Sequence, residues 1–442
     1  MVPASEHPTL KRIGAGVPSE PPPVTLEEVR AWCSELGIDD VGCVAVEREG
    51  VASERAAAEG LLPGTRTLIS VVMRMNRENI RSTARSVANL EFHQTGHALN
   101  AAARALVMRL ESRGHRAVNP SVGFPMEMDR FGTGRGWVIS HKPIAVAAGL
   151  GHMGIHRNVI HPRFGNFILL DTILTTARIH HDVEPLNFNP CLECKLCVAA
   201  CPVGAIAPDG RFDFSACYSH NYREFMGGFT DWVEAIADAP NAKAYRAKFS
   251  DGESASMWQS LSFGANYKAA YCLAVCPAGE DVIAPFVQNR AGFVSQVLRP
   301  LQQKEENVYV VQGSDAEAHV TKKFPHKHVR RIRSGLRPSS VASLIAAMPH
   351  VFQRGPALGL DAVYHFRFTG KEPRDVTVTI RDQTLRVEDG LRGDPSLTII
   401  ADGETWIGFL RKERNLLWAI LRRKVRLKGN PGLLLKFGKC FP

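Results

Sequence analysis

The sequence lacks any long apolar run: no hydrophobic stretch approaches the roughly 18 to 20 residues that are needed to span a bilayer. Its first residues, MVPASEHPTLKRIGAGVPSEPPP, lack both the apolar core of a secretory signal and a twin-arginine pair. We therefore expect residues 1–23 to form a flexible leader and the protein to be cytoplasmic. Glycine and proline, at 37 and 27 of 442 residues, are too few for a collagen-like or disordered chain.

Acidic residues are also relatively few, with 44 Asp and Glu against 54 Lys and Arg, which gives a formal net charge of +10. This excess permits an anionic partner such as RNA, a phosphate-rich cofactor or a lipid headgroup, but it identifies none of them. Seven of the 10 cysteines fall between Cys191 and Cys276. In a reducing compartment, such clustering indicates metal binding rather than disulfide bonds.

The order of apolar patterns predicts an α/β or α+β fold with several domains. The segment TLEEVRAWCSELG predicts a helix that opens with a capping box, Thr25 with Glu28, and that buries Cys33. Strands are expected at DVGCVAV and TLISVVM, and a long helix from about residue 94 to 112. The predicted divisions are a first α/β domain at 24–185, a loop-rich cysteine module at 186–298, a solvated basic linker at 299–337 and an α+β domain at 338–442.

The segment NPCLECKLCVAACPVGAI resembles one half of a bacterial two-cluster ferredoxin. Three closely spaced cysteines bind one iron–sulfur cluster in that motif, and the cysteine before proline binds the other cluster. The second motif, YCLAVCPAG, supplies the missing ligand, because its Cys276 also precedes a proline. We therefore expect a first [4Fe-4S] cluster, rather than a zinc site, at Cys191, Cys194, Cys197 and Cys276.

A second cluster would be bound by Cys201, Cys217 and Cys272, which leaves it one thiolate short. A complete motif would have cysteine three residues before Cys272, where this sequence has Ala269. The second cluster is therefore predicted as a [3Fe-4S] cluster or as a [4Fe-4S] cluster with another fourth ligand. The candidates for that ligand are His220, Asn221 and the remote Cys440.

Upstream of the cysteines, LLPGTRTLISVV and HKPIAVAAGLGHMGIHRNVIHPRFGNFILLDTILTT resemble the cobalamin-dependent family of reductive dehalogenases and epoxyqueuosine reductase. The resemblance covers about residues 25–285 and implies a nitroreductase-like domain that binds base-off cobalamin. It further implies that low-potential clusters reduce the cobalt to Co(I), so that the cofactor supplies the chemistry. The glycines would let backbone approach a flat ligand, and the other side chains would donate to it. The predicted cofactor-binding residues are Gly149, Gly151, His152, Gly154, Arg157, Asn158 and His161.

The catalytic residues of this family are only partly recognisable. In the epoxyqueuosine reductases that this chain resembles, an acidic residue shortly before the GLG segment is the general acid. This chain has Arg135 at that place, and His141 replaces a nearby acidic residue. The tyrosine that serves dehalogenases as proton donor is also missing, and Phe92 and His93 stand near its place. His141 and His93 are thus the predicted proton donors, since imidazole titrates near neutral pH, and Arg135 is a further candidate. The segment around His93 also resembles a cobalt-ligating signature in which Glu91 replaces Asp.

The last part of the chain, about 338–442, resembles the sterol-carrier-protein type 2 domain, with DPSLTIIAD and VRLKGNPGLLLKF as its clearest signals. This resemblance implies a curved sheet whose helices enclose an apolar tunnel for lipids or acyl chains. The basic LRRKVRLK segment is a candidate contact for anionic headgroups or CoA phosphates. Residues predicted to line the tunnel are Trp406, Phe409, Leu410, Leu416, Leu417 and Trp418.

Together these features predict a cobalamin- and iron–sulfur-dependent reductase that acts on a hydrophobic small molecule or lipid. Its electrons would come from a low-potential donor such as ferredoxin or flavodoxin, and it would make at most peripheral contact with membranes. The enzymatic alternative is a tRNA-modifying enzyme like epoxyqueuosine reductase, although the lipid-type domain makes nucleic acid an unexpected partner. A non-catalytic electron-transfer protein with a lipid-binding adaptor is the third hypothesis.

Overall fold

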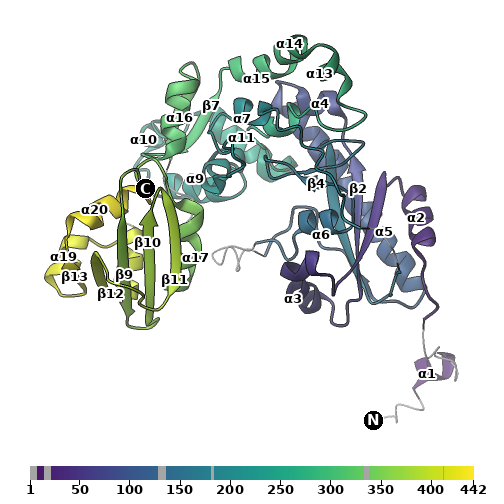
Figure 1. Ribbon diagram of the computed structural model, residues 1–442, viewed down its shortest axis with the longest axis horizontal. Coiled ribbons are helices and arrows are strands. Elements are labelled where there is room, and N and C mark those ends of the chain that lie inside the picture. Colours follow the sequence, from purple (N-terminus) through teal and green to yellow (C-terminus); the bar gives the residue numbers. More distant parts are fainter. Residues whose placement is uncertain (1–6, 14–20, 128–135, 181–183, 333–337, 412) are drawn as a thin grey trace.

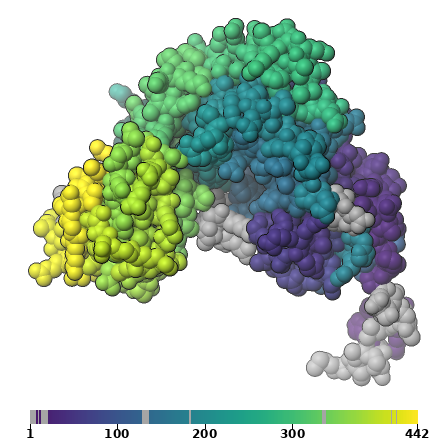
Figure 2. All heavy atoms as spheres, viewed as in Figure 1, coloured from purple at the N-terminus to yellow at the C-terminus, as the bar shows by residue number. Residues whose placement is uncertain are grey.

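The computed structural model describes residues 7–13, 21–127, 136–180, 184–332, 338–411 and 413–442, without the side chains of Leu10 and Leu417. Its two large sheets lie at opposite ends of the molecule, and the cysteine-bearing helices lie between them (Figure 1). Figure 2 shows the same order in a space-filling view, with the N-terminal domain in purple and the C-terminal domain in yellow and light green. No helix within the described ranges is long and apolar enough to cross a membrane.

The N-terminal sheet has the strand order β1-β2-β6-β3 and is antiparallel throughout. Strand β2 is buried along almost its whole length, as expected for a strand with both faces covered. Its residues alternate between two cores: Ile69 and Val71 face helices α2 and α5, whereas Leu68 and Val72 face α3 and α6. The elements are β1 (Asp40–Ala45), β2 (Thr67–Arg74), β3 (Ala117–Val118), β6 (Ile168–Thr175), α2 (Leu26–Glu35), α3 (Ala52–Leu61), α5 (Arg85–Ser112) and α6 (His141–Ala147).

The predicted helix start at Thr25 is confirmed. Its hydroxyl accepts from the Glu28 amide at 3.2 Å, and the Glu28 carboxylate accepts from the Thr25 amide at 2.9 Å. Cys33 is 1% exposed, as predicted. Helix α5, however, begins at Arg85, nine residues before the predicted start. Its first turns are fixed by a buried carboxylate, because Glu91 accepts hydrogen bonds from the Asn76 amide and the Asn79 side chain.

The cysteine module is built from helices around short ligand-bearing loops. Helices α7 and α12 each carry one cysteine of a motif, Cys197 and Cys272, and they pack against each other. Two longer helices, α9 and α11, lie in the segment between Cys217 and Cys272. The module contains α7 (Leu196–Ala200), α8 (Phe214–Asn221), α9 (Gly227–Asp238), α10 (Ala242–Arg246), α11 (Asp251–Phe263), α12 (Tyr271–Ala274), α13 (Ala284–Gln288), α14 (Arg290–Phe293) and α15 (Arg299–Gln303), with α4 (Arg77–Arg81) against it.

Within the stretch predicted to be a solvated linker, 299–337, the described residues 299–332 are instead largely structured. Strands β7 (Asn307–Val311) and β8 (His328–Ile332) pair in parallel, with α16 (Asp315–Lys323) between them. Val308 and Val310 are almost fully buried in the same core as the helices of the cysteine module. The basic side chains obscure these apolar positions in the sequence, and Lys327 itself is buried in an ion pair with Glu306 at 2.7 Å.

The C-terminal sheet has the order β11-β10-β9-β12-β13, with β9 and β12 parallel. Alternate residues of β9, namely Tyr364, Phe366 and Phe368, form the core beneath the helices, so the predicted α+β architecture is confirmed. Helix α17 contacts α8 of the cysteine module. The elements are β9 (Ala362–Thr369), β10 (Arg374–Arg381), β11 (Thr384–Asp389), β12 (Leu397–Asp402), β13 (Val425–Gly429), α17 (Val341–Val351), α18 (Gly403–Leu410), α19 (Leu416–Leu421) and α20 (Gly432–Lys439).

Candidate functional site

The four cysteines predicted for the first cluster line a single small cavity, together with Ile155 and His156. Burial raises the pKa of Cys197 to about 12, and it also raises the pKa of Cys194 and Cys276. Thiolates in such surroundings need a positive partner, which iron supplies. No three His, Cys, Asp or Glu side chains in the described part of the chain are arranged to hold a single metal ion. Four cysteines around one cavity are the donor set that a [4Fe-4S] cluster needs.

The three cysteines of the second group also lie close together. Burial is the main cause that raises the pKa of Cys217, and the charges of Cys272 and Cys201 add to it. Burial raises the pKa of Cys272 to about 11, while the Lys142 ammonium opposes that change. The charge of Cys272 also raises the pKa of Cys197, so the two groups are neighbours. This proximity suits electron transfer from one cluster to the other.

Of the three candidates for a fourth ligand of the second group, Asn221 and Cys440 are engaged elsewhere, whereas one ring nitrogen of His220 is not. The Asn221 Oδ1 accepts from the Ala269 amide at 3.0 Å. The His220 Nδ1 accepts from the Tyr309 amide at 3.4 Å, and its other nitrogen is buried without a hydrogen-bond partner. Cys440 lies in the core of the C-terminal domain, where its thiol donates to the Lys436 carbonyl at 3.4 Å. The hypothesis that Cys440 completes the cluster is therefore wrong.

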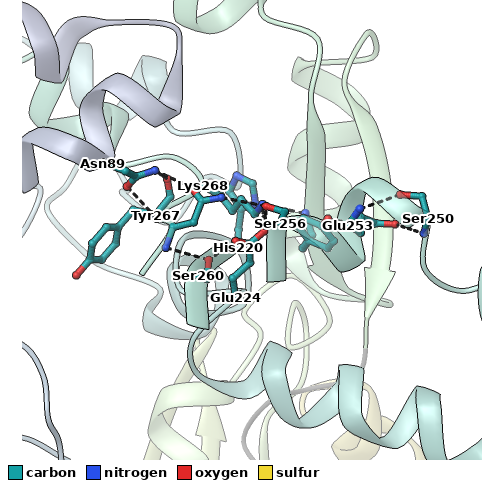
Figure 3. Close-up of polar contacts among 11 residues, drawn as sticks. Asn89, His220, Glu224, Ser250, Glu253, Ser256, Ser260, Tyr267 and Lys268 are labelled. Carbon is teal, nitrogen blue, oxygen red and sulfur yellow. Dashed lines mark hydrogen bonds and ion pairs between the residues drawn. The ribbon is translucent and has the colours of Figure 1, made fainter. Parts of the chain in front are cut away.

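The loop before Ala269 is held by a network of polar contacts (Figure 3). The Asn89 Oδ1 of α5 accepts from the Tyr267 amide at 3.0 Å. Lys268 forms an ion pair with Glu224, whose carboxylate also accepts from the Ser256 hydroxyl at 2.6 Å. These contacts tie the long helices of the cysteine module to the first domain and fix the backbone beside the second cysteine group.

The glycine-rich segment follows α6 and forms a short hairpin, β4 (His152–Met153) and β5 (Val159–Ile160). Gly149 has a φ of +76°, a conformation that suits a turn after a helix. A Cβ at Gly151 would lie 2.6 Å from the Ile160 carbonyl oxygen, and one at Gly154 would lie 2.7 Å from the Ile160 side chain. The space beside these two glycines is therefore filled by protein, so close packing of the hairpin explains them and the predicted approach of a flat ligand does not.

One side of the hairpin faces the second cysteine group. The Asn158 amide lies 3.9 Å from the Cys272 sulfur, and its oxygen accepts from the Lys142 ammonium at 3.0 Å. Lys142 also donates to the Arg157 carbonyl at 2.8 Å. These donors could bind a corrinoid's amides or its phosphate. Lys142 was missed in the sequence, because only the fold brings α6 next to the cysteines.

The remaining predicted cofactor ligands are less available. His161 bonds through Nε2 to the Asp40 carboxylate at 2.8 Å, and its Nδ1 accepts from the Arg163 amide at 3.1 Å. Nδ1 of His161 thus serves the turn and Nε2 is bound to β1, which argues against its predicted role as a donor to cobalamin. The His152 ring is half-buried, and its Nδ1 lies 3.3 Å from the Met153 carbonyl oxygen.

The predicted proton donors lie in different surroundings. His141 lies against β6, with Thr172 Oγ1 at 3.0 Å and the buried Asp171 carboxylate at 3.8 Å, and burial lowers the pKa of His141. His93 packs against Gly264, and burial also lowers its pKa. Arg135 lies outside the described residues.

An aromatic cluster beside the second cysteine group was not predicted. Tyr267 lies between Phe92 and Phe225, at centroid distances of 5.3 and 5.0 Å, and Tyr222 is 5.9 Å away. Burial, then the charges of Cys217, Tyr267 and Cys272, raise the pKa of Tyr222 well above its ordinary value. Tyr222 thus lies near the second cysteine group with Tyr267 packed against it, although neither lies on α5, where the resemblance to dehalogenases places a tyrosine.

The residues predicted to line a lipid tunnel do not share one environment. Trp406 is 3% exposed and packs against Phe366 and Phe409. Leu416 packs at the edge of the same core. Leu410 and Trp418 are 38% and 61% exposed, so the prediction that Trp418 lines an interior tunnel is wrong. The side chain of Leu417 lies outside the described residues.

Comparisons with known proteins give a family match for the C-terminal domain and partial matches to known enzymes. Residues 354–442 match the SCP-2 sterol transfer family. Epoxyqueuosine reductase of Synechococcus sp. strain CC9605 is 38% identical over 81 residues, which are 17% of this chain and 23% of that protein. The enzyme of Vibrio cholerae is 33% identical over 89 residues, 20% of this chain and 24% of that protein. The chain thus matches about a quarter of the length of these relatives.

Solved structures resemble this chain only weakly. Epoxyqueuosine reductase from Streptococcus thermophilus has a TM-score of 0.32 and 18% identity, covering 42% of this chain and 54% of that one. The reductive dehalogenase NpRdhA in complex with 3-bromo-4-hydroxybenzoic acid has a TM-score of 0.36 and 15% identity, covering 62% of this chain and 34% of that one. A likeness at this level carries no functional conclusion.

Proposed function

We propose that this chain is an iron–sulfur- and cobalamin-dependent reductase. The observation that carries the proposal is the contact between the second cysteine group and the hairpin after α6, where Asn158 lies 3.9 Å from Cys272 and binds Lys142. A corrinoid held by Lys142, Asn158 and the Arg157 guanidinium would lie beside the cluster that reduces it. When bound, cobalamin supplies a strongly reducing cobalt centre.

The chain's own residues would bring electrons to this place from the surface. Cys191 and Cys194 are only partly buried, and Leu192 beside them is 43% exposed. We infer that a low-potential donor such as ferredoxin or flavodoxin docks here. The electron would pass through the first group to the second, since Cys197 and Cys272 are electrostatic neighbours.

Anaerobic purification with iron, sulfide and corrinoid quantification tests the proposal. We expect hydroxocobalamin to bind at about one per chain, and Lys142→Met to weaken that binding. Lys371→Met, which changes an exposed lysine of the C-terminal domain, is the control. Clusters without any corrinoid uptake would overturn the proposal and favour the electron-transfer hypothesis.

Two substrates have support of different kinds. The relatives are named as epoxyqueuosine reductases, which favours the alternative of a tRNA-modifying enzyme and is the stronger support. This makes nucleic acid a candidate partner, contrary to the expectation from the sequence. The net charge of +10 is compatible with it.

The C-terminal domain supports a hydrophobic substrate or lipid instead. It matches the SCP-2 family. It is also hydrogen-bonded to the preceding part of the chain, because the Asp315 carboxylate accepts from the amides of Arg354 and Gly355 at 2.8 and 3.0 Å. Parallel assays decide between the two. Binding of tRNA that weakens steeply with salt supports the first, and displacement of a fluorescent fatty acid supports the second.

A further inference from the structure

The two cysteine motifs form the same local structure twice. Cys194 precedes α7 by two residues, and Ala269 precedes α12 by two residues. In each case the residue between has left-handed backbone: Lys195 with φ 61° and ψ 14°, and Ala270 with φ 55° and ψ 26°. Such a conformation is uncommon outside glycine, so its recurrence marks equivalent loops. Cys197 then corresponds to Cys272.

This correspondence places Ala269 at the position that Cys194 occupies in the first group. Ala269 is 5% exposed and belongs to the same core as Cys197 and Cys201. The loop at Ala269 therefore has the backbone conformation of the loop at Cys194, but it offers no thiol.

The loop that carries Ala269 is also held by hydrogen bonds, which hinders another side chain from replacing the missing thiol. The Asn221 carbonyl oxygen accepts from the Lys268 amide at 3.2 Å, and the Asn221 side chain accepts from the Ala269 amide. Asn89 and Glu224 hold Tyr267 and Lys268 from the other side (Figure 3).

We propose that the second cysteine group binds its cluster through three thiolates only, with one iron, at Ala269, that no cysteine holds. This inference rests on the proposed function only in that the cysteines bind iron–sulfur clusters, and it does not need cobalamin. Such an iron is easily lost on oxidation. Its departure as Fe²⁺ from a [4Fe-4S]²⁺ cluster releases one electron, which ferricyanide accepts, and leaves a [3Fe-4S]⁺ cluster.

The test is EPR with iron analysis on the anaerobically purified full chain. After mild ferricyanide treatment we expect the signal of a three-iron cluster and about seven iron atoms per chain. Ala269→Cys should abolish that signal and raise the iron content to about eight. Ala247→Cys, which adds a thiol at an exposed position of the same module, should leave the signal unchanged.

The repeat provides a reciprocal variant. Cys194→Ala should give the first group the same open position, so that the three-iron signal about doubles. Wild-type protein that keeps about eight irons and shows no such signal would overturn the inference, as would an Ala269→Cys variant that retains it. Neither result depends on corrinoid uptake. A chain that binds no iron would instead overturn the proposed function.

Discussion

The two large sheets bury different chemistry. Beneath its helices the C-terminal sheet places apolar side chains such as Phe366 and Ile399. The N-terminal sheet is covered on both faces, yet Asp171 and Thr172 of β6 are 0% exposed beside His141. Burying a carboxyl group costs stability unless all its hydrogen bonds are satisfied, and the Asp171 Oδ2 has no partner.

This difference shows which of the two sheets holds an unsatisfied polar group beside the candidate site. His365 and Thr377, which are buried in the C-terminal sheet, are hydrogen-bonded to backbone carbonyls. The N-terminal sheet retains a costly polar group within reach of α6, the helix that also carries Lys142. The following variants test whether this contrast is real.

The largest effect is expected from Phe366→Ala in the C-terminal core. Phe366 is 1% exposed and lies against Trp406 and Phe437. Its removal should lower the free energy of unfolding by about 3–5 kcal/mol. Hydrogen exchange in β9 and β12 measures the loss. Leu358→Ala, at a position 75% exposed in the same domain, should cost under about 0.5 kcal/mol, and equal losses in the two variants would show that Phe366 does not support this core.

Asp171→Asn tests the polar face of the N-terminal sheet. Burial raises the pKa of Asp171 to about 8, above its value of about 4 in the unfolded chain. Asp171 therefore penalises the folded state increasingly as pH rises between about 4 and 8, by up to about 1.4 kcal/mol per pH unit. The lowered pKa of His141 acts oppositely, since it reduces stability as pH falls below about 6.5.

The comparison of wild type with Asp171→Asn separates these two groups. We expect the variant to be more stable than wild type at pH 8, with little difference at pH 4. Urea unfolding at both values measures this. A difference that does not change with pH would mean that Asp171 keeps the same charge in both states.

Thr25→Ala tests a purely local feature of the N-terminal domain. The variant loses the hydrogen bond from the Glu28 amide to the threonine hydroxyl, which should cost about 1 kcal/mol of unfolding free energy. Thr25→Ser keeps the hydroxyl and should retain most of the stability. An equal loss in both variants would show that the methyl group matters and the cap does not.

Local features of this kind were predictable from the sequence. The capping box at Thr25 and the alternation in β9 each depend on residues a few positions apart, and the structure has both. Cys191, Cys194 and Cys197 could be grouped because their spacing is a local pattern as well, and they line one cavity in the structure.

Features that depend on distant parts of the chain were not predictable. Helix α5 begins early because Asn76 and Asn79 satisfy Glu91, and residues 307–332 are structured because Val308 meets the cysteine module. Lys142 and Tyr267 join the site only through tertiary contacts.

The smallest effect on stability is expected from Trp418→Ser, because this side chain is 61% exposed on α19. The change should alter the unfolding free energy by under about 0.5 kcal/mol. Its surroundings nevertheless favour an anionic membrane surface. Residues 414–442 contain eight Lys and Arg and no Asp or Glu, and Leu421 is 73% exposed beside them.

An exposed tryptophan and leucine beside basic side chains are typical of interfacial membrane binding, whereas RNA would gain little from leucine. We expect the protein to sediment with vesicles that contain anionic lipid. Lys424→Glu should weaken that binding at least about fivefold, and Trp418→Ser should weaken it as well. Leu358→Ser, at a position 75% exposed elsewhere in the domain, should not. Equal binding by all three variants would place the membrane contact elsewhere, and binding of RNA in place of vesicles would assign the basic surface to the tRNA candidate.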